Sequence, residues 1–167
     1  NSMSIEIRKA QTDDHLQIWE IFRDVIKSGD TYVFSPDSTQ EQGLQNWVGP
    51  KFHTYVACES NSILGTYIIK QNQPDLGSHV ANASYMVAPK AQGKGIGKLM
   101  AQHSLEVAKR LGFKAMQFNI VVSTNEIAVN LWKKLGFEII GTIPKGFNHK
   151  DLGYVDAYIM YQKLMDF

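Results

Sequence analysis

Hydrophobic and polar residues alternate along several segments of the chain, and this pattern predicts seven β-strands. In residues 4–10, Ile5 and Ile7 alternate with charged neighbours, which is the two-residue period of a half-buried strand. Six further strands are predicted at residues 54–58, 63–70, 79–88, 114–122, 137–143 and 154–163. A short polar stretch separates the second and third strands, so we expect them to form an antiparallel hairpin.

Between these strands, apolar residues recur at spacings of three and four, which predicts four helices. They are expected at residues 12–28, 39–48, 96–111 and 123–135. Thr12 is the expected N-cap of the first helix, and Ser123 with Glu126 forms a capping box for the fourth. The order β-α-α-β-β-β-α-β-α-β-β indicates one α/β domain over residues 3–167, with a mixed sheet.

Composition narrows the function classes. The 167 residues are 44% hydrophobic and carry a net charge of +1, which excludes a disordered chain and gives no electrostatic case for a nucleic-acid partner. No long apolar run or signal pattern is present, so we expect a cytoplasmic protein with no membrane partner. The single cysteine, Cys58, is interpreted as a packed small hydrophobe. Asn1 and Ser2, ahead of Met3, are expected to be a cloning remnant.

The segment most informative about chemistry is residues 87–98, a strand end followed by a glycine-rich turn and a helix start. Glycines at 93, 95 and 97 allow a tight turn whose successive N–H groups face one anion, and the positive end of the helix adds to this. Lys94 and Lys98 supply mobile positive charge. The segment therefore predicts a phosphate or pyrophosphate site.

Two common phosphate motifs do not fit this segment. A Walker loop would need glycine where Gln92 stands and Ser or Thr after Lys98, and the dinucleotide pattern lacks its third glycine. The pattern that fits is Gln-x-x-Gly-x-Gly at Gln92, Gly95 and Gly97, which resembles the coenzyme A loop of the GCN5-related N-acetyltransferases. The alternative is a glycine-rich helix entry with no ligand.

A second motif of that superfamily lies downstream, and the two together cover about residues 79–143. Its residues are Asn125, Ala128, Leu131, Trp132, Leu135, Gly136 and Phe137. The resemblance implies a twisted mixed sheet of about seven strands with helices on both faces, and a splay between the fourth and fifth strands.

The resemblance also implies acetyl-CoA as co-substrate, direct acetyl transfer to an amine, and no metal. A backbone N–H near Val87 would stabilise the oxyanion. The residues implied in cofactor binding are Met86, Val87, Gln92, Gly93, Lys94, Gly95, Ile96, Gly97, Lys98, Asn125 and Trp132.

Two positions depart from the superfamily pattern. Trp132 stands where many members have a tyrosine acting as general acid, and an indole has no proton to give at neutral pH. Trp132 would either shape the wall of the pantetheine site or belong to the core. Residues 79–87 also contain no carboxylate that could act as a base. Catalysis is then expected to depend on positioning, a water relay or an amine that arrives neutral.

Within the superfamily, the sequence resembles the fungal azetidine-2-carboxylate acetyltransferases. The shared stretches are Ser-His-Val-Ala-Asn-Ala before the loop, and Phe-Asn-Ile-Val with Ser-Thr-Asn after it. In those enzymes an asparagine on each splayed strand holds the substrate, which implies catalytic roles for Asn82 and Asn119. The alternative is that these amides satisfy backbone groups at the splay. His103 lies on an apolar helix stripe and is interpreted as a packed residue.

The leading hypothesis is an N-acetyltransferase whose acceptor is a small-molecule amine, an amino acid or a proline-like analogue. The alternatives are a protein or peptide N-acetyltransferase and a non-catalytic acyl-CoA-binding module. Residues 32–34 and the loop at residues 145–151 are expected to flank the acceptor cleft. Members of the superfamily often dimerise, so a homodimer is a further expectation, although no feature of the sequence fixes an interface.

Overall fold

The computed structural model describes residues 4–167, so the expected cloning remnant lies outside the described residues. Seven strands and four α-helices are found there. The strands are β1 (Glu6–Lys9), β2 (His53–Glu59), β3 (Ser62–Gln71), β4 (Val80–Val87), β5 (Ala115–Val122), β6 (Glu138–His149) and β7 (Gly153–Lys163). The helices are α1 (His15–Ile26), α2 (Gln40–Gln45), α3 (Ile96–Arg110) and α4 (Glu126–Lys134).

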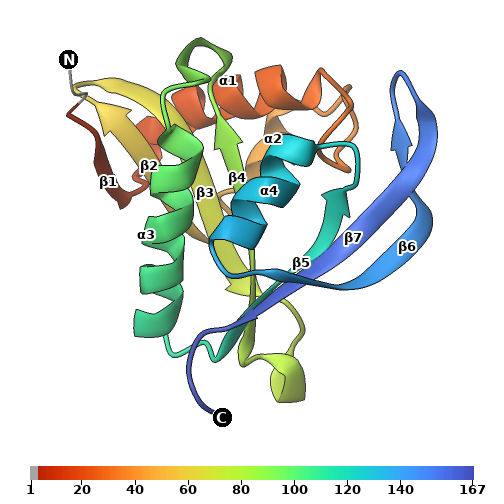
Figure 1. The fold of residues 1–167 in the computed structure, drawn as a ribbon. Coiled ribbons are helices and arrows are strands. Elements are labelled where there is room, and N and C mark those ends of the chain that lie inside the picture. The colour runs from red at the N-terminus through yellow and green to blue at the C-terminus, as the bar shows by residue number, and fades with distance from the viewer. Residues whose placement is uncertain (1–3) are drawn as a thin grey trace.

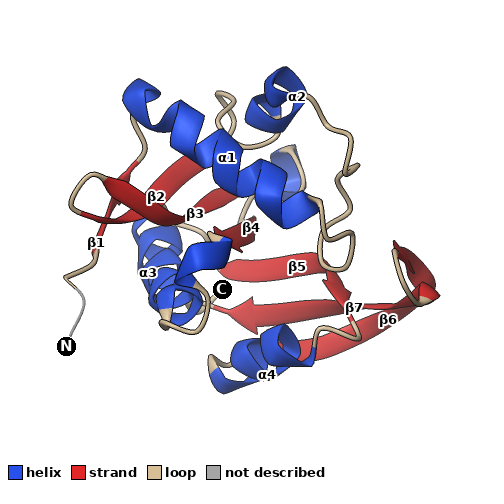
Figure 2. Cartoon of the chain, turned by 90° about the horizontal axis from the view of Figure 1, so that it is seen from above, coloured by secondary structure: helices blue, strands red, loops and turns tan. Residues whose placement is uncertain are grey.

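The strands form one mixed sheet in the order β1-β2-β3-β4-β5-β7-β6 (Figure 1). β4 and β5 are parallel, and every other neighbouring pair is antiparallel. Viewed from above, α1 and α2 lie on one side of the sheet and α3 and α4 on the other (Figure 2). The predicted α/β fold, with helices on both faces, is confirmed.

The core forms where the apolar helix stripes meet the sheet. α1 buries Ile18 and Phe22, and the α2 side adds Trp47, which is fully buried. The indole N–H of Trp47 donates to Thr66 Oγ1 at 3.0 Å, so its polar group is satisfied inside the core. On the other face α3 lies close to β3, because Gly65 has no side chain: a Cβ there would lie 2.8 Å from Met100. Cys58 is buried, as expected.

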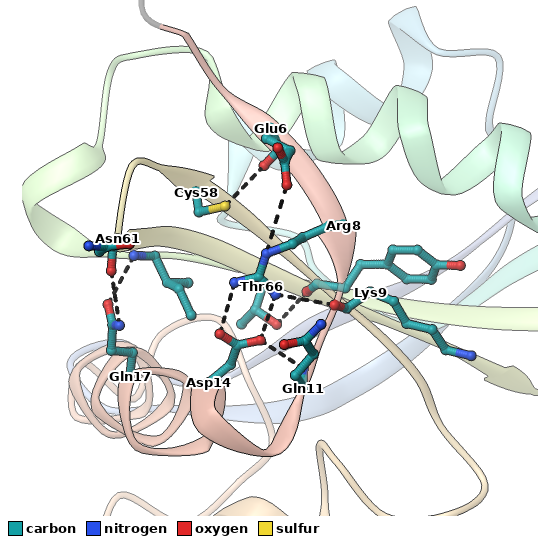
Figure 3. A network of polar contacts seen from close by, with 11 residues as sticks. Glu6, Arg8, Lys9, Gln11, Asp14, Gln17, Cys58, Asn61 and Thr66 are labelled. Carbon is teal, nitrogen blue, oxygen red and sulfur yellow. Dashed lines mark hydrogen bonds and ion pairs between the residues drawn. The ribbon is translucent and has the colours of Figure 1, made fainter.

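The start of α1 differs from the prediction. Thr12 lies inside a short 3-10 turn, Thr12–Asp14, and is not the cap of the helix. Asp14 instead holds the junction, because its carboxylate accepts hydrogen bonds from Arg8 Nη1 and Nη2 at 2.7 and 2.9 Å and from the Gln11 N–H at 2.7 Å (Figure 3). The hydrogen bond from Arg8 lowers the pKa of Asp14, so the ion pair between β1 and the helix start persists at neutral pH.

Two other boundaries also differ. α4 is capped by Asn125, whose side chain accepts from the Ala128 N–H at 3.3 Å, so the predicted Ser123 capping box is wrong. The segment predicted as a loop at residues 145–151 is largely strand, because β6 runs on to His149 through a change of register between Ile143 and Phe147.

Candidate active site

The predicted splay is present between β4 and β5. The two strands pair only at Val80 with Ala115 and at Ala81 with Met116, and then separate. A cavity of about 290 Å³, called here the central cavity, lies where they part. Its lining residues come from the loop after α1, from β3, β4 and β5, and from α4 with its N-cap: Thr31, Tyr32, Val33, Phe34, Lys70, Asn82, Ala83, Ser84, Tyr85, Phe118, Asn119, Ile120, Val121, Val122, Asn125, Ala128 and Trp132.

One edge of β4 is free along the splay. The backbone N–H groups of Asn72 and Ala88 donate to the carbonyls of Val80 and Leu64. The backbone groups of even-numbered residues of β4 therefore form the hydrogen bonds to β3. The backbone groups of odd-numbered residues therefore face β5. Val87 presents its N–H toward the gap, whereas the backbone of Met86 pairs with Thr66 on β3. Of these two predicted cofactor residues, Val87 has the backbone group free for a ligand.

Asn82 lies at the point where the strands separate. It is 9% exposed, and its Nδ2 donates to the Gln117 carbonyl at 3.0 Å, which a continuing parallel ladder would have used. Its Oδ1 takes part in none of the side-chain hydrogen bonds found in residues 4–167, and the residue lines the central cavity. Asn82 thus satisfies a backbone group at the splay and keeps one acceptor for another partner.

Asn119 also lines the central cavity, from the β5 side. Its Nδ2 donates to Asn72 Oδ1 at 2.7 Å, and its Oδ1 accepts from Gln117 Nε2 at 3.1 Å. The residue is exposed and lies where the pairing of β5 with β7 changes register. The structure therefore brings the two predicted asparagines to the same cavity.

An aromatic wall closes the α4 side of the cavity. Trp132 packs against Phe118 at 4.6 Å and Tyr85 at 5.0 Å between ring centroids, and it lines the cavity as well. It belongs both to the packed aromatic cluster and to the cavity wall. Burial raises the pKa values of Tyr32 and Tyr85 above the usual tyrosine range, so both hydroxyls keep their protons at neutral pH.

The glycine-rich loop has the conformation expected of an anion site. Gly93 and Gly95 both have φ of +78°, a left-handed conformation that favours glycine, and no atom lies within 4 Å of the Cβ that either would carry. Gly95 is the N-cap of α3, so the first N–H groups of that helix have no partner within it. Space and free donors therefore occur together at this loop.

Side chains around the loop add positive charge. Lys94 and Lys98 are exposed, and neither takes part in an ion pair found among the described residues. Gln92 is exposed and ends the short turn after β4, and Ile96 is buried and anchors the first turn of the helix. Asn125, predicted to bind cofactor, caps α4 with its Oδ1 and also lines the central cavity.

A second cavity of about 360 Å³, the loop cavity, adjoins the first through Tyr32, Val33 and Phe34. Its opposite wall is the end of β6 with Lys150, whose N–H donates to the Gly29 carbonyl at 3.0 Å. The two segments expected to flank the acceptor cleft therefore do line one cavity, although the second is a strand end rather than a free loop.

Sequence reasoning missed Lys70, Ser84 and Tyr85 as lining residues of the central cavity. Their strand positions were predicted, but which of them meet depends on the pairing of β3 with β4.

His103 is a packed residue, as interpreted: its Nδ1 lies 2.6 Å from the Tyr67 hydroxyl. In the described part of the chain, His, Cys, Asp and Glu side chains form no group of three or more that could hold a metal ion. Across residues 4–167 no helix has the length and apolar character needed to span a membrane.

Comparison with known proteins assigns this fold and site to a family. A sequence profile described as "Acetyltransferase (GNAT) family" matches residues 16–137, which is well over half of the chain. The chain therefore belongs to the GNAT acetyltransferase family, whose enzymes use acetyl-CoA as the acetyl donor.

Three relatives show how far the similarity extends. A GCN5-related N-acetyltransferase from Kribbella flavida has a similar structure, with a TM-score of 0.90, 40% identity and coverage of 96% of this chain and 98% of that one. The N-acetyltransferase aca1 of Schizosaccharomyces pombe is 42% identical over 99 residues, 59% of this chain and 47% of that protein, so the match spans about half of its length. The L-amino acid N-acetyltransferase AaaT of Escherichia coli is 29% identical over 159 residues, covering 93% and 96%.

Proposed function

We propose that this protein transfers the acetyl group of acetyl-CoA directly to the amine of a small molecule, an amino acid or a proline-like analogue. The observation that carries the proposal is the central cavity, where the free edge of β4 meets Asn82 and Asn119. Its volume of about 290 Å³ is at the lower end for small-molecule sites, which favours a small acceptor over a folded protein. The similarity to a relative named for L-amino acids supports the same class of acceptor.

The chain's residues fit the donor. The positive φ angles of Gly93 and Gly95, the empty space beside them and the free N–H groups at the start of α3 suit a pyrophosphate, and Lys94 and Lys98 can approach it. Gln92 and Gly97 complete the motif at this loop. When bound, acetyl-CoA supplies an acetyl thioester that is activated toward an amine.

The free edge of β4 orients the reacting group. Backbone groups facing the gap can pair with the amides of the pantetheine arm, and the Val87 N–H can donate to the carbonyl oxygen as negative charge develops on it. Trp132 forms an apolar wall of the same cavity and has no acidic proton for the leaving sulfur. The thiolate must therefore leave without a proton from this residue, and the proton that the attacking nitrogen loses on forming the amide balances the charge of the thiolate.

The acceptor amine is positioned by amide groups. Asn82 Oδ1 can accept a hydrogen bond from the amine, and Asn119 borders the same space. Neither amide titrates, so neither can remove a proton from an ammonium group. The reactive form of the acceptor is then the neutral amine, held close to the acetyl carbon.

The test is thiol release from acetyl-CoA with a panel of amines, amino acids and short peptides, with products identified by mass spectrometry. We expect acetylated amino acids or cyclic amino-acid analogues as products. Acetylation of peptides alone would support a protein N-acetyltransferase instead. Binding of acetyl-CoA without turnover on any member of the panel would support the non-catalytic module.

A further inference from the structure

The charged side chains that line the central cavity and the cavity beside it all carry the same sign, and the family motifs do not account for this feature. Among the residues lining the central cavity in the described chain, Lys70 is the single charged one. A third cavity of about 530 Å³, here the basic cavity, shares Lys70 and is also lined by Lys51 and His53, with no Asp or Glu in its wall. An anion entering from this side would meet positive charge only.

Lys70 is placed beside the asparagine that faces the acceptor. It lies on β3 directly opposite Asn82 on β4, and side chains of directly paired residues share one face of a sheet. Their Cβ atoms are then about 5 Å apart. A single small molecule can therefore contact both side chains at once.

The lysine has no anionic partner in the described structure. It takes part in none of the ion pairs found in residues 4–167, and its ammonium lies 5.7 Å from the ring centroid of Phe52. Half-burial and the nearby Lys51 lower the pKa of Lys70. A bound carboxylate would offset both effects, because it places an opposite charge beside the ammonium.

We propose that Lys70 binds an acidic group of the acceptor, so that the substrate is an amino acid rather than a plain amine. The inference rests on the proposed function, since it names the acceptor of the same site. Asn82 would hold the amine nitrogen and Lys70 the carboxylate. In an α-amino acid these two groups are on the same carbon, which matches the neighbouring positions of the two side chains. Lys70 is thus a specificity residue, and it takes no part in proton transfer.

The experiment compares the amino acid of the panel that reacts fastest with the amine left when its carboxylate is removed, for example azetidine-2-carboxylate with azetidine. Lys70→Met should lower kcat/KM for the amino acid about 10- to 100-fold, mainly through KM, as loss of a charged hydrogen bond does. For the plain amine the change should stay within about 2-fold, because that substrate has no group for Lys70. Lys70→Arg should restore part of the activity on the amino acid.

Lys51→Met is the matched control, because Lys51 lines the basic cavity but not the central cavity. It should leave the preference for the amino acid within about 2-fold of wild type. Equal losses on both substrates in Lys70→Met, or no loss on either, would overturn the role of Lys70 while leaving the acetyltransferase intact. Preference of the wild type for plain amines would do the same. Absence of turnover with any amine would instead overturn the proposed function, and with it the acceptor role of Lys70.

Discussion

Asn82 and Asn119 provide the sharpest test of the site at the scale of single residues. Replacing either by alanine should lower kcat/KM on the order of 10- to 1000-fold, because a positioning contact to the amine is lost. The Kd for acetyl-CoA should stay unchanged, as neither side chain belongs to the glycine-rich loop. Steady-state kinetics and acetyl-CoA titration give the two quantities. Asn130→Ala, on the exposed surface of α4, serves as the control. Full activity in both cavity variants would leave the two asparagines with structural roles only.

A substitution at Gly95 tests whether the glycine-rich loop binds acetyl-CoA. Gly95→Asp puts a side chain and a negative charge into the open space at the start of α3, and should weaken acetyl-CoA binding by at least about 1 kcal/mol. Gly112→Asp is the matched control, because Gly112 also has a positive φ, of +88°, and open space around its Cβ position, but at the opposite end of α3. Equal affinity in the two folded variants would exclude this loop as the pyrophosphate site.

At the scale of elements, the cap of α4 shows a limit of sequence patterns. Ser123 and Glu126 have the spacing of a capping box, but the Ser123 N–H still bonds to the Asp156 carbonyl at 3.0 Å. Ser123 is thereby held in the pairing of β5 with β7, and the helix begins after Asn125. Both residues are good caps, so only the end of the strand pairing decides between them.

The assignment of the α4 cap to Asn125 can be tested by measuring the stability of two variants. Asn125→Ala should lower the free energy of unfolding by about 1 kcal/mol, because the Ala128 N–H loses its partner. Ser123→Ala should change it by less than about 0.5 kcal/mol, as surface substitutions without such a contact do. Urea denaturation of both variants provides the comparison. A larger loss of unfolding free energy in Ser123→Ala than in Asn125→Ala would show that Ser123 is the N-cap.

The extent of β6 could not be predicted either. Lys145 and Gly146 break the alternation of apolar residues, and Lys145 has a φ of +52°, which is typical of a turn. The strand continues because the register with β7 changes between Ile143 and Phe147, which absorbs the extra residues. Such a change depends on the partner strand, so the local sequence does not distinguish it from the end of the strand.

At the scale of the whole molecule, the order of elements and the glycine-rich loop follow from local patterns, whereas the cavity wall that holds Lys70 and Asn82 does not. Helix periodicity and the glycine spacing are properties of contiguous residues, so they were visible in the sequence. Lys70 and Asn82 are twelve positions apart and meet only through the register of β3 with β4. This wall of the central cavity is therefore assembled by pairing across the sheet.

Two histidines make the stability of the folded protein depend on pH. Burial lowers the pKa values of His53 and His103, and the Tyr67 hydroxyl, whose own pKa burial raises, lies within hydrogen-bond distance of His103 Nδ1. As pH falls through about 6.5, the unfolded chain binds protons that the folded protein does not, so stability decreases. His103→Gln should show a smaller decrease between pH 8 and pH 5.5 in urea denaturation. A decrease equal to that of wild type would contradict the contribution of His103.

The splay divides the sheet into two parts, β1 to β4 and β5 with β7 and β6, which are joined by the few contacts at Val80, Ala81 and Asn82. Along β4, amide protons should therefore alternate in their rate of exchange with deuterium. Those of Ser84 and Met86, bonded to β3, should exchange slowly, and those of Ala83 and Val87, facing the gap, should exchange faster. If acetyl-CoA takes the place of the missing neighbour strand, its binding should slow the second pair and leave the first unchanged, so that one strand records the occupancy of the site residue by residue.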